Sequence, residues 1–226
     1  MKDFILNLPN RDPLEVLYEK ESNPENNLRN IEALIIETNY AFNDLGLYTK
    51  HIGKGMDIDE DTFRQYADSL MKEMLPTIEI IPTQNAFSQL KAVALVSSPN
   101  CECYKPFESD GIRPNKDFFY NIVYESLSAL ITMGYNNIGI AGLTGSLRFI
   151  DDHQYRNAVA EAVCHAAHDF PSLKKIQIIS FGPIISYGVQ YFNQFTSEAG
   201  LHKKISIQER ELYGIKRITL DIPRRF

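Results

Sequence analysis

The sequence predicts an α/β protein built in layers, and three observations support this. Segments with strand patterns alternate with segments of helical pattern along the 226 residues. The runs "IEALIIETN" (31–39) and "NIGIAG" (137–142) are largely apolar without alternation, which is typical of strands buried on both faces of a sheet. A glycine-bearing loop then leads from the second run into an alanine-rich helix, as in a parallel strand–helix unit.

Strands are predicted wherever short apolar runs are bounded by turn residues. The expected strands are 2–8, 31–39, 77–83, 90–99, 137–142 and 174–181, with one or two more within 204–222. The asparagine-rich stretch 18–30 is expected to be an exposed loop or an insertion, because it is polar and lacks periodicity.

Helices are predicted at 57–75, 116–135, 154–170 and 188–200. The first begins with several acidic residues and stops at Pro76, which cannot continue a helix. The second is strongly amphipathic and has Gly134 near its C-terminal end. Residues 100–115 read as a surface loop, and no linker separates domains. We expect a single domain over 1–226, with an extension from about residue 196 as the alternative.

Composition limits the classes of partner. The formal charge of −6 disfavours general nucleic-acid binding, because the surface as a whole repels phosphates. The tail 215–226 carries a basic cluster that is either a local patch or a solvated edge. No apolar run approaches the ~20 residues needed to span a bilayer, so no membrane association is expected.

The same composition bears on location. The first residues have too short an apolar run for a secretory signal. The three cysteines, Cys101, Cys103 and Cys164, cannot all pair internally, which favours a reduced compartment. The cytoplasm is the expected location, although export by a route without such a signal stays open.

Two glycine-bearing loops are candidates for binding a phosphate. In "AGLTGSLRF" (141–149), Gly142 and Gly145 permit close backbone approach, Thr144 and Ser146 bring hydroxyls, and Arg148 brings a cation. "HIGKGMDIDED" (51–61) also follows a parallel-type strand and precedes a helix. Both loops could close on one ligand, but each alone could be a plain strand-to-helix turn.

With these stretches in view, the chain resembles the macro domain, a family that binds ADP-ribose and related nucleotides. "IEALIIETN" stands where the family has a strand ending in "NAAN", and Asn39 keeps the last asparagine. "GKGMD" resembles "GGGVD", keeping Gly53, Gly55 and Asp57. The pair of strands within 77–99 ends in a "VGP"-like turn, and "YNNIGIAGLTGSLRF" resembles a strand followed by the family's "STGVYG" loop. The resemblance covers residues 1 to about 195.

The resemblance implies a three-layer α/β/α fold with a mixed, largely parallel central sheet. It also implies a nucleotide cleft between residues 51–57 and 142–149. In that cleft Asn39 would meet the distal ribose, with Asp57 near it. Phe181 would stack on adenine. The residues implied around the diphosphate and its loop are Gly53, Gly55, Gly142, Thr144, Gly145, Ser146, Leu147 and Arg148.

Four positions depart from the family pattern. Ile36 stands in the place of the first motif asparagine, and Leu143 in that of a serine. Leu147 replaces the usual loop aromatic, and Arg148 replaces a glycine. These departures predict that ADP-ribosyl hydrolase activity, for which Asn39 and Asp57 are the candidate catalytic residues, is weak or absent.

Other reactive side chains favour structural roles. His165 and His168 have a spacing that could suit a metal, but no third ligand is evident, and histidines near a helix C-terminus favour the helix dipole. Cys101 and Cys103 lack a second pair of ligands. His153 lies beside Asp151 and Asp152 and is expected on the surface or in a cap. We therefore expect no metal and no cofactor.

The sequence thus leads to two hypotheses of different class. In the first, the protein binds ADP-ribose or a related nucleotide, free or attached to an ADP-ribosylated macromolecule. In the second, it is an interaction module whose nucleotide cleft has decayed and whose contacts come from the segment after residue 195.

Overall fold

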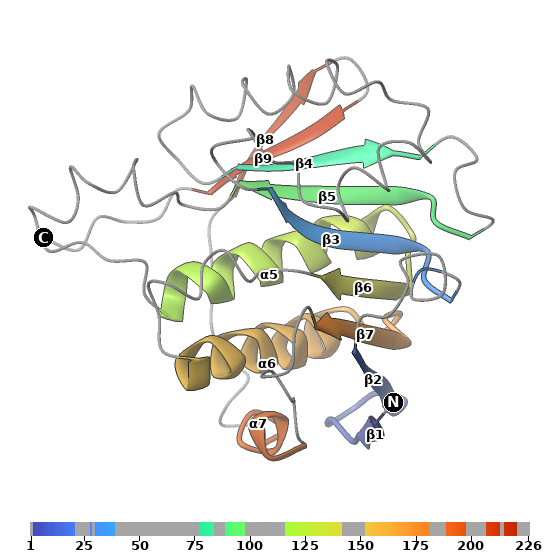
Figure 1. The fold of residues 1–226 in the computed structure, drawn as a ribbon, viewed down its shortest axis with the longest axis vertical. Coiled ribbons are helices and arrows are strands. Elements are labelled where there is room, and N and C mark those ends of the chain that lie inside the picture. Colours follow the sequence, from blue (N-terminus) through green and yellow to red (C-terminus); the bar gives the residue numbers. More distant parts are fainter. Residues whose placement is uncertain are drawn as a thin grey trace, which may run out of the picture.

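The computed structural model describes residues 2–20, 28, 30–38, 77–83, 89–97, 116–141, 152–180, 189–197, 207–212 and 215–220. Its strands form one nine-stranded sheet in the order β1-β2-β7-β6-β3-β5-β4-β9-β8 (Figure 1). The strands are β1 (Lys2–Leu6), β2 (Leu14–Lys20), β3 (Ala33–Thr38), β4 (Thr77–Pro82), β5 (Ala92–Ser97), β6 (Asn137–Ala141), β7 (Lys175–Ser180), β8 (Ile207–Leu212) and β9 (Ile215–Leu220).

The centre of the sheet is parallel and its flanks are antiparallel. Strands β2, β7, β6, β3 and β5 run in the same direction. β1 joins this group antiparallel at one side, and β4, β9 and β8 join it antiparallel at the other. The predicted mixed sheet is therefore confirmed, with parallel pairing concentrated in the middle.

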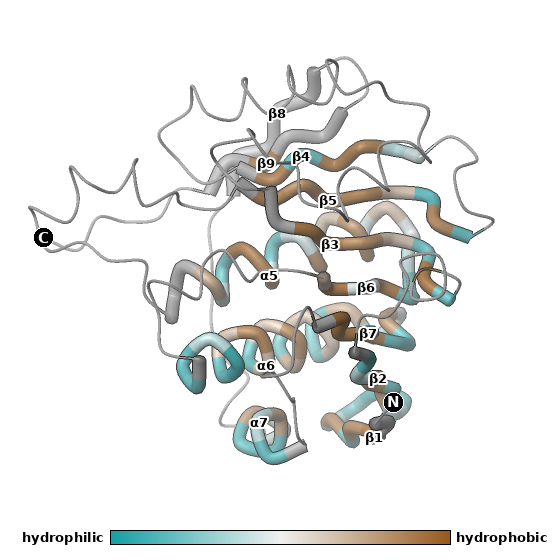
Figure 2. Tube along the Cα trace, viewed as in Figure 1, coloured by the Kyte–Doolittle hydropathy of each residue, from teal (hydrophilic) through white to brown (hydrophobic). Residues whose placement is uncertain are grey.

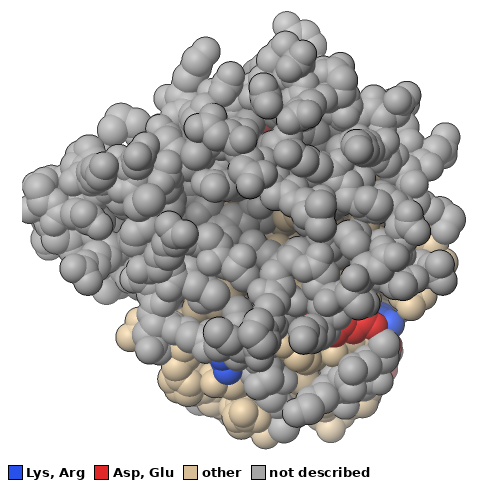
Figure 3. Space-filling model, in the orientation of Figure 1, with Lys and Arg blue, Asp and Glu red and all other residues tan. Residues whose placement is uncertain are grey.

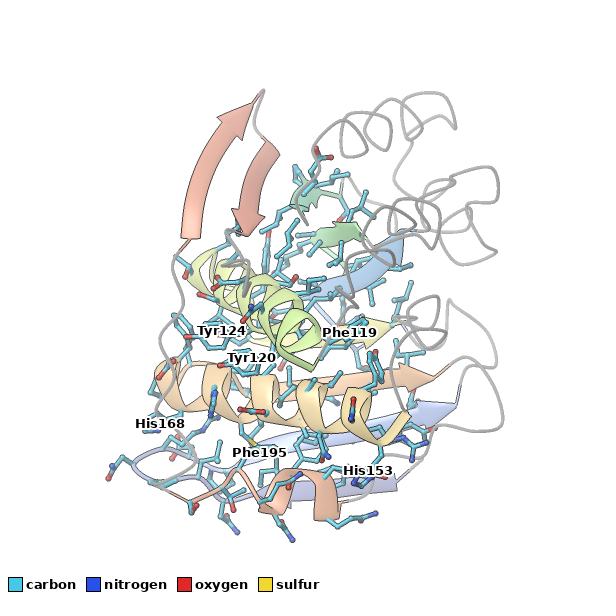
Figure 4. All side chains as sticks on the ribbon, turned by 90° about the vertical axis from the view of Figure 1, so that its left-hand side faces the viewer. Phe119, Tyr120, Tyr124, His153, His168 and Phe195 are labelled. Atoms are coloured by element: carbon cyan, nitrogen blue, oxygen red, sulfur yellow. The ribbon has the colours of Figure 1, made fainter. Side chains whose placement is uncertain are left out.

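Three helices are described: α5 (Lys116–Thr132), α6 (Asp152–Asp169) and α7 (Val189–Asn193). α5 and α6 pack against each other along one face of the sheet (Figures 1 and 4). They share one hydrophobic core with alternate strand residues, including Val16, Ala33, Ile35, Ile78, Ala94, Ile140 and Ile178. Figure 2 shows the same pattern, because α6 is apolar toward the sheet and polar on its outer side.

The opposite face of the sheet, which we call the second face, is buried as well. Leu34, Val93 and Leu95 point away from α5 and α6, yet each is at most 1% exposed. Because both faces of the central strands are covered, the sheet lies in the interior, as a three-layer α/β fold requires.

The sequence prediction was wrong about β2. The sequence predicts a polar loop at 18–20, but these residues continue a strand from Leu14 to Lys20. Leu14 and Val16 are fully buried beside β7, and this parallel partner is far away in the sequence. Helix α7 is much shorter than the helix predicted at 188–200. The helix predicted at 57–75 lies outside the described residues.

A glycine conformation and a contact from a distant residue mark the ends of the two long helices. Gly134, with φ of 95°, follows α5 in the left-handed conformation that glycine adopts at little cost. At the end of α6, the guanidinium of Arg11 donates hydrogen bonds to the carbonyl oxygens of Ala167, at 2.6 Å, and Leu173. This contact holds the β1–β2 connection against the C-terminal end of α6. None of the helices in the described ranges is long and apolar enough to cross a membrane.

Candidate functional site

The five parallel strands end together at one edge of the sheet, which we call the carboxyl edge. Ile36, Ala141 and Ile179 are paired side by side across β3, β6 and β7, and Leu95 of β5 pairs with Ile36. Four of these strands, β3, β5, β6 and β7, stop within two residues of this row, at Thr38, Ser97, Ala141 and Ser180. Ligands of open α/β sheets gather at this kind of edge, where helix N-termini also lie.

The predicted site residues follow these strand ends. Asn39 comes directly after Thr38, Gly142 after Ala141, and Phe181 after Ser180. All the predicted residues lie outside the described part of the chain, namely Asn39, Gly53, Gly55, Asp57, Gly142, Thr144, Gly145, Ser146, Leu147, Arg148 and Phe181. The structure thus places the strands that carry three of the predicted segments at one edge.

Ile36 is the one departure from the family pattern that is described. Its side chain is 3% exposed and belongs to the second face of β3, in register with Leu95 and Ala141. A hydrocarbon side chain there cannot donate or accept a hydrogen bond. The position compared with the first motif asparagine is therefore part of the apolar interior.

Sequence reasoning missed a polar pair on the second face near the carboxyl edge. The amide nitrogen of Gln177, a residue that is only 2% exposed, donates to Oε2 of Glu19 at 2.9 Å. Glu19 is half-buried and is in register with Ile179. The sequence does not reveal this pair, because it predicts a loop at 18–30, which includes Glu19. Its geometry holds a carboxylate as a hydrogen-bond acceptor one residue before the strand ends.

A second cluster that the sequence did not reveal joins the first turns of α6 to α7. Nδ1 of His153 lies 3.2 Å from the hydroxyl of Tyr191, and Nη1 of Arg156 donates to the same hydroxyl at 3.4 Å. The Arg156 guanidinium also lies over the Tyr191 ring, 5.6 Å from its centroid. Figure 4 shows His153 beside α7, and its exposure agrees with the prediction of a surface residue.

His165 and His168 lie in the second half of α6, and Figure 4 labels His168 toward the end opposite His153. His165 is buried, and its Nδ1 is 2.6 Å from the hydroxyl of Tyr120 on α5. The hydroxyl of Tyr124 donates to Asp169 at 2.6 Å, and burial raises the pKa of both tyrosines above their ordinary value. These contacts join α5 to α6 and account for His165 without a ligand.

Within the described ranges, no three His, Cys, Asp or Glu residues are grouped so that they could hold a metal ion. The thiol of Cys164 is buried, and burial raises its pKa to about 12, which makes it a poor nucleophile. Cys101 and Cys103 lie outside the described residues.

One carboxyl in the core is unusual. Glu125 on α5 is 0% exposed, and neither of its carboxylate oxygens has a hydrogen-bond partner. Burial raises its pKa to about 7. At neutral pH the carboxyl therefore exists in both its protonated and its ionised form.

The described part of the face in Figure 3 is mostly uncharged, with small patches of acidic and basic atoms, of which one acidic patch adjoins basic atoms. No extended basic area is visible on that described part.

Comparison with known proteins adds the decisive observation. No protein-family model matches the sequence, and no curated protein sequence matches it either. The fold does match solved structures. The Oceanobacillus iheyensis macrodomain with ADP superposes with a TM-score of 0.56 at 11% identity, covering 85% of this chain and 94% of that one. The chain has the macrodomain fold.

Two further macrodomain structures agree. A mutant of the Oceanobacillus iheyensis macrodomain with ADPR gives a TM-score of 0.54 at 9% identity, over 85% of this chain and 96% of that chain. The macrodomain of Mycobacterium tuberculosis DarG gives 0.50 at 8% identity, over 72% and 96%. At such identities the likeness concerns the macrodomain fold, and the ligands in those structures belong to those proteins.

Proposed function

We propose that this protein binds ADP-ribose or a related nucleotide at the carboxyl edge of β3, β5, β6 and β7. The observation that carries the proposal is the macrodomain fold, since solved macrodomains with this arrangement contain ADP or ADPR. The arrangement of the strands supports it, because three of the predicted binding segments follow strand ends that lie within two residues of one register row.

The proposed contacts divide the ligand into three parts. Asn39 would meet the distal ribose with Asp57 near it, and Phe181 would stack on adenine. The diphosphate would lie against Gly53, Gly55, Gly142, Thr144, Gly145, Ser146, Leu147 and Arg148. Backbone N–H groups and the N-terminal end of α6 suit this charge, because a helix N-terminus attracts anions.

We propose that hydrolysis of ADP-ribosyl bonds is weak or absent. Such a reaction needs a water held beside the distal ribose, and a misplacement of about 1 Å can cost on the order of a hundredfold in rate. The buried, apolar Ile36 supports this part of the proposal, since it leaves no polar group at its position on β3. An ADP-ribosylated macromolecule would then be a bound partner more than a substrate.

The same residue favours the second candidate function. If the loss of polar groups extends beyond Ile36, the fold serves as an interaction module without a nucleotide. The two functions differ in one measurable property, the affinity for ADP-ribose.

Calorimetric titration with ADP-ribose tests the proposal, with ADP and NAD as related ligands. Asp57→Asn should weaken binding, because we propose that Asp57 lies near the distal ribose. Glu15→Gln is the matched control, since Glu15 pairs with Lys175 at 3.8 Å where β2 and β7 begin, at the other end of the strands. No heat of binding for the wild-type protein at millimolar ligand would reject the nucleotide function and leave the interaction module.

A further inference from the structure

The hairpin of β8 and β9 places two arginines on the same face of the sheet. Ile218 of β9 is 1% exposed and belongs to the core shared with α5 and α6. Because successive residues of a strand belong to opposite faces, Arg217 belongs to the second face. Arg210 of β8 is directly opposite Arg217 in the antiparallel register, so it belongs to the second face as well. The two arginines therefore form one cross-strand pair.

The other face of the same hairpin carries a different combination of charges. Glu211 is opposite Lys216 there, and Glu209 is opposite Ile218. Opposite charges across an antiparallel pair stabilise it, whereas like charges directly opposite each other destabilise it. The pairing of β8 with β9 therefore does not account for the two arginines on the second face.

The row of the two arginines continues onto β4. Arg217 is in register with Glu79, which is 1% exposed. Glu79 lies between Ile78 and Ile80, which both belong to the core shared with the helices, so Glu79 is also on the second face. One carboxylate can neutralise at most one guanidinium. The row of Glu79, Arg217 and Arg210 therefore keeps at least one positive charge in excess.

Uncharged hydrogen-bonding residues come next to the arginine pair on the same face. Gln208 is opposite Thr219 in the adjacent cross-strand pair of that face. Amides and hydroxyls can donate hydrogen bonds, and a guanidinium donates in a fork that matches the oxygens of a phosphate. Directly opposite residues have Cβ atoms about 4.5–5.5 Å apart, which suits a group of that size. Within β8 and β9, both glutamates belong to the other face.

We propose that the second face of β8 and β9 binds a phosphate group. Arg210 and Arg217 supply its charged donors, and the dianion offsets the repulsion between them. Gln208 and Thr219 supply neutral donors beside them. The site is distinct from the proposed nucleotide site, because Arg217 shares a register row with Ile36 three strands away, or about 14 Å at ~4.8 Å per strand. It does not rest on the nucleotide function.

Calorimetric titration of the full chain tests the site, with inorganic phosphate and a phosphoserine peptide as probes at one ionic strength. Arg210→Gln should weaken binding about tenfold or more, the range of a lost charged hydrogen bond. Lys216→Gln is the matched control, because it removes the same charge from the other face of the hairpin, and it should change the affinity less than twofold. Tighter binding of the peptide would assign the site to phosphorylated proteins, and equal binding to the free anion.

Thermal unfolding provides a second readout and detects a variant that fails to fold. Without phosphate, Arg210→Gln should melt at the temperature of the wild type or higher, because it removes a like-charge pair. Phosphate should raise the melting temperature of the wild type and of Lys216→Gln more than that of Arg210→Gln, since a ligand stabilises the folded state to which it binds.

Three results would overturn the phosphate site. They are equal affinities of Arg210→Gln and Lys216→Gln for both probes, no binding of either probe by the wild type, and a lower melting temperature of Arg210→Gln without phosphate. The last would mean that Arg210 stabilises the hairpin itself. Phosphate binding that depends on Arg210 in a protein that does not bind ADP-ribose would reject the nucleotide function alone.

Discussion

Burial is the main cause of the shifted pKa values of side chains in the α5–α6 layer. Glu125, Cys164 and Tyr120 all lie within the α5–α6 layer, and in each case the pKa rises because the charged form loses its hydration. For the thiol and the phenol, the consequence at neutral pH is chemical inertness. For the carboxyl it is a dependence of stability on pH.

Glu125 should make the protein less stable as pH rises. The folded state holds the proton with a pKa of about 7, above the ordinary value of 4.5, so it binds more protons than the unfolded state between these values. The free energy of unfolding therefore falls from about pH 4.5 to 7 and stays lowered above that range. We expect this decrease in unfolding free energy to be about 1–3 kcal/mol. It is smaller than the full pKa shift implies, because water and neighbouring groups rearrange around a charge.

Urea denaturation of Glu125→Gln at several pH values measures this effect. The amide cannot ionise, so the variant should be more stable than the wild type at pH 8.5 and should lose the decline above pH 4.5. Glu15→Gln, which alters a carboxyl that is 46% exposed, serves as the control. A parallel pH profile for Glu125→Gln and the wild type would contradict the assignment.

Cys164 should resist thiol reagents in the folded protein. Its pKa of about 12 leaves almost no thiolate at neutral pH, and the side chain is 0% exposed. Peptide mass spectrometry after treatment with a maleimide should find Cys164 unlabelled without denaturant and fully labelled in urea. Rapid native labelling would mean that α6 opens readily.

At the scale of helices and strands, a few close contacts hold neighbouring elements together, and substitutions at these contacts should lower stability. α5 and α6 are joined through Tyr120 and His165, whose rings meet edge-on with centroids 5.3 Å apart. Tyr120→Phe keeps the ring but leaves Nδ1 of a buried histidine without the hydroxyl. We expect a loss of about 1–3 kcal/mol in unfolding free energy, measured by urea denaturation. Tyr124→Phe is the natural comparison, because its contact to Asp169 is exposed and should be worth less.

In β6, Gly139 is required by close packing. A Cβ atom there would lie 2.6 Å from Cδ1 of Ile31 and 3.1 Å from Cδ1 of Leu34, so both side chains would have to move. Gly139→Ala should lower unfolding free energy by about 1–3 kcal/mol, the range for overpacked cores. Thermal unfolding with no loss of stability would show that Ile31 adopts another rotamer at little cost.

For the whole molecule, the C-terminal hairpin belongs to the same sheet as the rest. β9 pairs with β4, and Ile218 is 1% exposed within the common core. We therefore expect a chain ending at residue 206 to unfold at a clearly lower temperature than the full chain. Calorimetry that found equal melting temperatures would mean that β8 and β9 are an independent addition.

The fold was predictable where the pattern is local. The unbroken apolar runs of β3 and β6 and the amphipathic repeat of α5 identify these elements without knowledge of their partners. β2 was missed because its identity as a strand depends on β7, far away in the sequence. The contact between His153 and Tyr191 was missed for a similar reason, since it requires α6 and α7 to be packed. Nothing in the sequence around Glu125 indicates that its carboxyl is buried.

For the candidate site, the sequence predicts which residues bind the ligand. The structure describes the strands that directly precede Asn39, Gly142 and Phe181. The role of each predicted residue stays a prediction, because Asn39, Asp57, Phe181 and both glycine loops lie outside the described ranges. Ile36 is different, since its burial could be read from the apolar run that contains it.

The pairing of β2 with β7 has a consequence for how the chain reaches this structure. β2 pairs with β1 early in the chain, but its other neighbour is β7, and Arg11 bonds to Leu173 across 162 residues, so these contacts form only after most of the protein has been synthesised. Contacts of such long range slow folding, because a large loop must close before they form. During translation, the apolar side chains of β1 and β2 therefore lack their partners in the core until the later part of the chain has been made. In this interval a nascent chain is prone to aggregate or to bind a chaperone.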